Sequence, residues 1–136
     1  MAERLEVDGS CHCGQITYSA RVDPSSVSIC HCTDCQALTG SAFRVTVTAR
    51  REDVFLTAGE PAVYVKTGES GGRRYQHFCP RCGSPTYVTG DGDPDIGLRW
   101  GGIRQRDLLM PTAAIWCASK VPWLNDVTDL PGTSRE

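Results

Sequence analysis

The sequence predicts a small, all-β, single-domain protein that is clamped together by bound metal. Its 136 residues suit one domain with one modest hydrophobic core. Short segments in which apolar and polar residues alternate recur between turns rich in glycine and proline, which is typical of half-buried strands. Seven of the eight cysteines lie in C-x-C or C-x-x-C spacings, which favours metal ligation over disulfide bonds.

Strands are predicted wherever the alternation is sustained. In residues 14–22 every second residue is apolar, so these side chains are expected on one face of a strand. Similar patterns predict further strands at 42–50, 62–67, 73–78, 84–88, 95–100 and 113–118. The glycine-rich residues 68–72 are expected to join two of these strands as a hairpin, and residues 90–94 to form a surface loop.

Two short segments have helical signals. Thr33 and Gln36 match a capping box and Gly40 matches a C-terminal cap, so one or two helical turns are expected before Gly40. A second short turn is expected at residues 105–109, where Pro111 prevents extension.

Composition excludes several classes of partner. Lysine and arginine total 14 and aspartate and glutamate 16, so the net charge is −2 and no block of like charge stands out. This offers no surface for nucleic acid or an anionic membrane. The segment MAERLEVDGS lacks the apolar core of a signal peptide, and no apolar run is long enough to span a membrane. We therefore expect one cytoplasmic domain over residues 1–136, with a loosely ordered polar tail from about residue 129. The sequence does not indicate an oligomeric state.

Two cysteine pairs with a long spacer predict one structural zinc site. Zinc prefers a tetrahedron of thiolates at about 2.3 Å, which places the sulfur atoms roughly 3.8 Å apart. A bend in each pair brings its sulfur atoms to that separation, and in CPRCG the residues Pro80 and Gly83 favour the required turn. The simplest set of ligands is Cys11, Cys13, Cys79 and Cys82. Such a closed site contributes its binding energy largely to folding.

The remaining cluster, Cys30, Cys32 and Cys35, supplies only three ligands. Three protein ligands with an open position distinguish catalytic from structural zinc, so this cluster is the candidate catalytic site. The fourth position would hold water or a substrate thiol, and bound zinc lowers the pKa of such a thiol.

Other residues offer alternatives to an open site. Cys117 or a histidine would close the triad as a fourth ligand, although a lone cysteine among apolar residues is most often a small buried hydrophobe. His12 and His31 lie between paired cysteines and are expected to point away from the metal, and His77 is expected to be structural. A redox thiol cluster without metal is a further alternative.

Three motifs resemble the glutathione-dependent formaldehyde-activating enzyme family, which includes centromere protein V: GSCHCGQITY, CHCTDCQALTGSAF and FCPRCGSPTYV. The resemblance covers roughly residues 8–130 and implies the β-tent fold. It also implies that the four-cysteine set holds structural zinc and that Cys30, Cys32 and Cys35 hold catalytic zinc. The family's founding reaction condenses glutathione with formaldehyde, a carbon–sulfur bond formation classed as a lyase reaction. Ala114 and Arg104 stand where the family often has histidine and aspartate.

The leading hypothesis is therefore a zinc-dependent enzyme of the carbon–sulfur lyase type that adds a small thiol, glutathione or a relative, to an aldehyde such as formaldehyde. Its candidate substrate-carboxylate contacts are Arg44, Arg73, Arg74 and Arg99, although each is individually expected on a solvated strand face. A non-catalytic, zinc-stabilised binding module is the alternative, because no Ser–His–Asp or paired-carboxylate arrangement is visible. Methionine sulfoxide reduction with Cys117 as the thiol rests on fold analogy alone.

Overall fold

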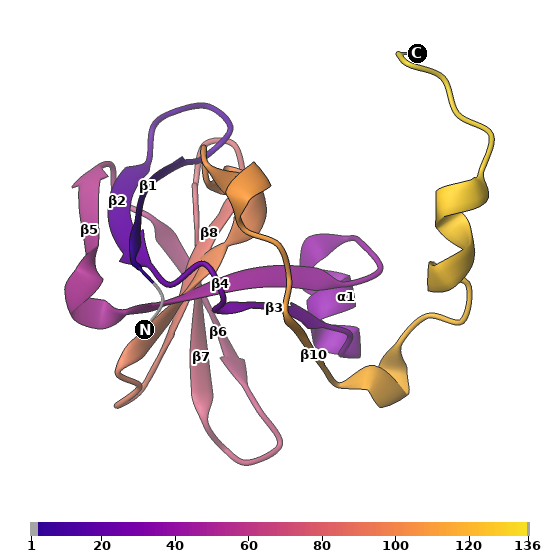
Figure 1. The fold of residues 1–136 in the computed structure, drawn as a ribbon. Helices are drawn as coiled ribbons and strands as arrows, with labels where there is room; N and C mark the ends of the chain where they lie inside the picture. The colour runs from indigo at the N-terminus through magenta and orange to yellow at the C-terminus, as the bar shows by residue number, and fades with distance from the viewer. Residues whose placement is uncertain (1–2, 136) are drawn as a thin grey trace.

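The computed structural model describes residues 3–135 and confirms the all-β class (Figure 1). The ends of the predicted domain, residues 1–2 and 136, lie outside the described part. The regular elements within it are β1 (Leu5–Ser10), β2 (Thr17–Val22), β3 (Val27–Cys30), α1 (Thr33–Thr39), β4 (Arg44–Arg50), β5 (Val54–Ala58), β6 (Ala62–Thr67), β7 (Arg73–Phe78), β8 (Pro85–Gly90), β9 (Asp95–Arg99) and β10 (Ala113–Ile115). Short 3₁₀ turns connect them at Arg51–Asp53, Trp100–Gly102, Arg106–Leu108, Cys117–Ser119 and Leu124–Asp129.

The strands form two sheets. A three-stranded sheet has the order β1-β2-β5, and a seven-stranded sheet has the order β10-β3-β4-β9-β8-β7-β6. All pairs are antiparallel except β10 with β3, which run parallel. In Figure 1 the smaller sheet covers one side of the larger one, and α1 lies beside the ends of β3 and β4 on the other side.

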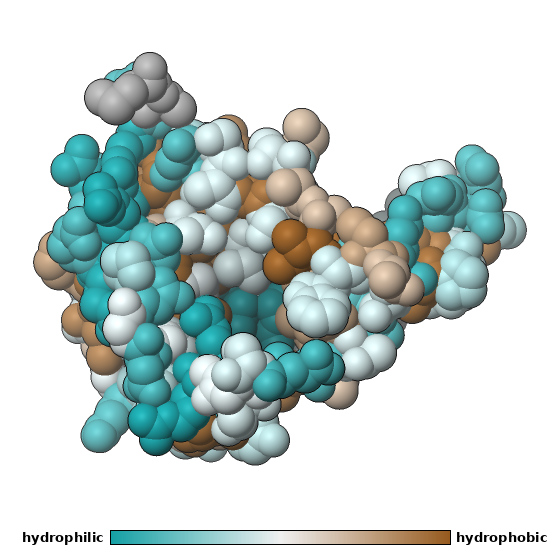
Figure 2. Space-filling view, turned by 90° about the horizontal axis from the view of Figure 1, so that it is seen from below, coloured by the Kyte–Doolittle hydropathy of each residue, from teal (hydrophilic) through white to brown (hydrophobic). Residues whose placement is uncertain are grey.

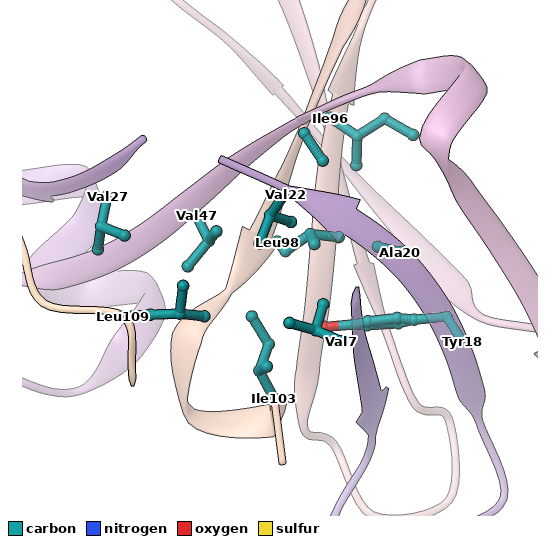
Figure 3. Packing of buried hydrophobic residues seen from close by; sticks show 11 residues of the cluster. Val7, Tyr18, Ala20, Val22, Val27, Val47, Ile96, Leu98, Ile103 and Leu109 are labelled. Carbon is teal, nitrogen blue, oxygen red and sulfur yellow. The ribbon is translucent and has the colours of Figure 1, made fainter. Parts of the chain in front are cut away.

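The core lies where the two sheets meet. Val22 from the smaller sheet and Val47 and Leu98 from the larger one are fully buried there, together with Ile103 and Leu109 from the following turns (Figure 3). The alternation predicted in residues 14–22 is confirmed, since the apolar side chains of that segment all point into buried positions. One face of the larger sheet packs on this core, so its opposite face can carry polar groups.

Three strands were not predicted: β1, β3 and β5. β3 and β5 lack a long alternating pattern, and the residues Phe55 and Leu56 of β5 are exposed. β3 pairs with β4 and β10, and β5 pairs with β2, so their strand conformation comes from pairing with neighbours rather than from their own pattern.

The helix begins one residue earlier than the capping box requires. Cys32, not Thr33, is the N-cap, and its sulfur accepts a hydrogen bond from the Cys35 N–H at 3.2 Å. Gln36 instead donates its side-chain amide to the carbonyls of His31 and Ser119. The capping-box prediction was therefore wrong, because a cysteine sulfur took the role expected of the threonine hydroxyl.

The C-terminal end of the helix agrees with prediction. Gly40 adopts the left-handed conformation with φ 64° and its N–H bonds to the Gln36 carbonyl. The predicted turn near residues 105–109 is also present, as the 3₁₀ turn Arg106–Leu108.

After β10 the chain leaves the two sheets and projects away from them on the side of α1 (Figure 1). Trp116, Trp123 and Leu130 are exposed there. The loosely ordered tail from about residue 129 stays a prediction. Among the described helices, none is long and apolar enough to cross a membrane.

Candidate metal centres and the adjoining cleft

The four cysteines of the predicted structural site lie together in space. Their sulfur atoms are all within 4.8 Å of one another, with 3.6 Å between Cys11 and Cys13 and 3.7 Å between Cys13 and Cys79. These separations suit a tetrahedral thiolate site, in which sulfur atoms are roughly 3.8 Å apart. Cys11 and Cys79 are buried, whereas Cys82 is exposed, so the cluster lies at the edge of the fold.

The two cysteine pairs are held by the same kind of turn. Gly14 and Gly83 follow the second cysteine of each pair, with φ of 83° and 79°, and donate their N–H groups to the carbonyls of Cys11 and Cys79. The positive φ requires glycine at both positions. Backbone N–H groups donate to the first sulfur of each pair: Ile16 to Cys11 at 3.2 Å and Cys82 to Cys79 at 3.5 Å. Such bonds stabilise the thiolate form that a metal needs.

The three remaining clustered cysteines also meet. Cys30 ends β3, Cys32 caps α1 and Cys35 lies in its first turn, and their sulfur atoms lie within 4.8 Å of one another. All three are half-buried. Burial raises the pKa of the Cys32 thiol. Hydrogen bonds, led by the one from the Cys35 N–H, together lower it by more, so the pKa of Cys32 lies below its usual value. The donor set and its spacing fit a metal ion, and zinc suits thiolate ligands of this kind.

A polar cleft of about 390 Å³ opens beside the three-cysteine cluster. Seen from the side on which the β6–β7 hairpin projects, the surface is hollowed and the floor of the hollow is hydrophilic (Figure 2). The cleft lies along the polar face of the larger sheet. It is lined by four cationic side chains, Arg44, Lys66, Arg74 and Arg99, and by three acidic ones, Asp34, Asp93 and Asp95. The structure therefore places positive charge next to the candidate metal ligands.

Arg44 and Arg99, which we call the arginine pair, are buried rather than solvated. Their residues are 5% and 8% exposed, which contradicts the expectation of solvated strand faces. The Arg99 guanidinium donates to the hydroxyl of Thr46 at 2.9 Å and to the amide oxygen of Gln76 at 2.7 Å, both neutral groups. Burial, with Arg44 close by, lowers the pKa of Arg99 to about 9. Arg44 Nε, also buried, has no hydrogen-bond partner among residues 3–135.

The other cations of the cleft have acidic partners. Lys66 Nζ lies 2.8 Å from a carboxylate oxygen of Asp34, and this hydrogen bond raises the pKa of Lys66. Arg74 pairs with Asp93 at 2.9 Å. The remaining arginine proposed from the sequence, Arg73, is exposed, pairs with Asp91 and does not line the cleft.

A second cavity of about 370 Å³ adjoins the arginine pair. Arg44 and Arg99 line it as well, but its remaining wall is largely apolar, with Phe43, Val45 and Trp100. The two hollows therefore meet at the arginine pair, an arrangement that the sequence analysis did not predict.

The histidines and the last cysteine have structural or surface positions. His77 stacks on Tyr87 with ring centroids 4.4 Å apart and bonds to Thr89, as expected for a structural residue. His12 is exposed, whereas His31 is buried against Phe43. Cys117 is exposed, so the expectation of a small buried hydrophobe was wrong, and it does not join either cysteine cluster of the described chain.

Comparisons with known proteins agree with these features. A search of curated proteins finds no match. A crystal structure of a Rhodobacter sphaeroides protein is similar to this chain, with a TM-score of 0.61 and 22% sequence identity. The matched region covers 79% of this chain and 98% of the Rhodobacter chain. This likeness supports the fold alone. The model of the glutathione-dependent formaldehyde-activating enzyme family matches residues 6–119, a span that contains all eight cysteines. The chain belongs to the glutathione-dependent formaldehyde-activating enzyme family.

Proposed function

We propose that this protein is a cytoplasmic, zinc-dependent enzyme of the carbon–sulfur lyase type that adds a small thiol, glutathione or a relative, to an aldehyde such as formaldehyde. The observation that carries the proposal is the three-cysteine cluster at the wall of a cationic cleft. In this proposal Cys11, Cys13, Cys79 and Cys82 hold a structural zinc, and Cys30, Cys32 and Cys35 hold a catalytic one.

The chemistry needs an activated sulfur atom. A zinc ion with an open coordination position supplies a lowered thiol pKa and a template for the two reactants. In the addition, a carbon–sulfur bond forms, the carbonyl π bond breaks, and the thiol proton ends on the carbonyl oxygen. No oxidant or reductant is required.

The side chains of the chain bind and orient the thiol. The first turn of α1 holds Cys35 in place, since its N–H is bonded to the Cys32 sulfur. The cations of the cleft favour a thiol that carries negative charge, such as glutathione, and the unpartnered Arg44 is the strongest candidate contact. Binding energy from such contacts orients the sulfur toward the aldehyde carbon.

The test is the rate of hemithioacetal formation, because a free thiol and formaldehyde also react without help. We expect NMR to show faster formation with the zinc-loaded protein than without it, and Cys30→Ser to lose the acceleration. Cys117→Ser is the matched control, because Cys117 is exposed and outside both clusters. Saturable thiol binding with no acceleration for any thiol–aldehyde pair would favour the alternative, a zinc-stabilised binding module without turnover.

A further inference from the structure

We infer that the arginine pair binds the carboxylate of a ligand whose apolar body occupies the second cavity. This deepens the proposed function and rests on it for the ligand's role: the thiol substrate would be a mercapto acid with an apolar group. Its carboxylate would meet Arg44 and Arg99, its apolar group would enter the second cavity, and its sulfur would reach the three-cysteine cluster from the cleft.

The first step is the missing counter-charge. A buried guanidinium is costly unless acceptors surround it, and removing its partner costs far more than the pair contributes. Arg99 uses two nitrogen atoms on neutral oxygens, and the buried Arg44 Nε bonds to no residue of the described segment. The acids near the cleft do not fill this need: Asp34 and Asp93 are paired with Lys66 and Arg74. Asp95 lies four residues from Arg99 along β9, so at about 3.3 Å per residue their Cα atoms are roughly 13 Å apart.

The second step is the charge of the metal cluster itself. Three thiolates around a divalent ion carry a net charge of −1, because −3 + 2 = −1. The arginine pair carries +2, so the pair and the cluster together leave one positive charge for a monoanion; Asp95, which also lines the cleft, lies at the opposite end of β9 from Arg99. Cys30 pairs with Arg44 across β3 and β4, which places the cluster and the pair at one site. A single carboxylate would complete the balance.

The third step is the shape of the second cavity. Its volume of about 370 Å³ lies within the range of about 300–1,000 Å³ that small-molecule sites occupy. Phe43, Val45 and Trp100 supply apolar wall, and no acidic side chain within residues 3–135 lines it. A planar or branched hydrocarbon group attached to the carboxylate suits this wall, whereas formaldehyde is far too small to use it.

Binding of phenylacetate to the zinc-loaded protein tests the inference without any turnover. Isothermal titration should show saturable binding, with benzyl alcohol, which lacks the charge, at least about tenfold weaker. Arg44→Gln and Arg99→Gln should each weaken phenylacetate about tenfold or more, since a bond to a charged group contributes about 1.5–3 kcal/mol. Arg44→Lys, which keeps the charge and the fold, should show a smaller loss. Arg73→Gln is the matched control outside the cleft and should bind as the unmodified protein does.

The variant Gly101→Leu tests the contribution of the second cavity while it leaves both arginines unchanged. Gly101 lines the second cavity, and a Cβ added there meets no atom within 4 Å, so the new side chain can enter the cavity without a clash. Gly101→Leu should weaken the binding of phenylacetate and leave the binding of acetate unchanged. Gly132→Leu, in the exposed C-terminal segment, is the matched control.

Three results would overturn the inference. The first is the lack of saturable phenylacetate binding, and the second is equal binding by Arg44→Gln and Arg73→Gln. The third is a loss of metal in Arg44→Gln with phenylacetate binding unchanged, which would make the arginine pair a counter-charge for the cluster alone. Intact phenylacetate binding with no acceleration of thiol addition would instead contradict the proposed function and leave the carboxylate site standing.

Discussion

Cys30 lies directly opposite Arg44 in the antiparallel pair of β3 and β4. Directly opposite residues on antiparallel strands have Cβ atoms about 4.5–5.5 Å apart, so strand register fixes a candidate metal ligand next to a buried guanidinium. The helix that follows β3 then brings the other two cysteines of the cluster to the same place. The register of β3 and β4 therefore places the three-cysteine cluster beside the arginine pair.

The two metal centres should respond differently to loss of a ligand. Cys11→Ser should lose one metal equivalent and much of the fold, because Cys11 is buried and its cluster joins the start of the chain to β7 and β8. Cys30→Ser should lose one equivalent and stay folded, because its cluster joins only neighbouring segments. Elemental analysis with circular dichroism measures both effects. Unfolding of Cys30→Ser to the same extent as Cys11→Ser would mean that both centres are structural.

Truncation of Leu98 should destabilise the core. Leu98 is fully buried between the sheets, so Leu98→Ala should lower the free energy of unfolding by about 2–5 kcal/mol through lost burial and a residual cavity. Urea denaturation of the zinc-loaded protein measures this. Leu108→Ala is the control, since Leu108 is 65% exposed and should change stability by less than about 0.5 kcal/mol. Equal effects at the two positions would contradict the placement of the core.

Gln36 should stabilise the junction between α1 and the C-terminal segment. Its amide donates to the carbonyls of His31 at 2.8 Å and Ser119 at 3.1 Å. Gln36→Ala should lower the free energy of unfolding by about 1–3 kcal/mol, at about 0.5–1.5 kcal/mol for each bond. The exposed Gln15 provides the control variant, Gln15→Ala, which should have little effect in the same denaturation experiment. A neutral result for Gln36→Ala would show that these bonds do not outweigh hydration of the free amide.

Asp8 should give the fold an acid-sensitive contact. Hydrogen bonds from Arg104 and then Gln105 lower the pKa of Asp8 to about 2. A depressed carboxyl pKa stabilises the folded state above the unfolded value of about 4, and this contribution is lost as the pH falls toward 2. Asp8→Asn should therefore be less stable than the unmodified protein at pH 7, and the difference should shrink as the pH falls below about 4 and through about 2.

Chemical denaturation of both proteins across this pH range measures the difference. Asp107→Asn is the control for removal of an exposed carboxylate from the same part of the surface, since Asp107 is also exposed. A gap between Asp8→Asn and the unmodified protein that stays constant from pH 7 to pH 2 would contradict the assignment.

Local sequence alone determined most of the strands and the content of both cysteine clusters. Alternation of apolar residues places side chains on one face of a strand whatever the strand packs against, so β2 and β4 could be predicted without knowledge of their neighbours. Close spacing of cysteines likewise limits their separation, and Gly14 and Gly83 mark the turns that bend each pair. The N-cap of α1 was misassigned because sequence rules for caps consider hydroxyls and carboxylates rather than a cysteine sulfur.

Only the tertiary structure decided the environment of the arginines. Arg44 and Arg73 are each the first residue of a strand, yet one is buried and the other is exposed beside Asp91. Both strands lie inside the seven-stranded sheet, so the difference comes from what packs on each of them: Arg44 lines the cleft together with residues of α1, whereas Arg73 follows the β6–β7 turn and does not line the cleft. Burial and the lack of a counter-charge depend on which segments pack together, and this pairing is long-range. The sequence therefore names the candidate metal ligands, while the packing of distant strands decides what charge surrounds them.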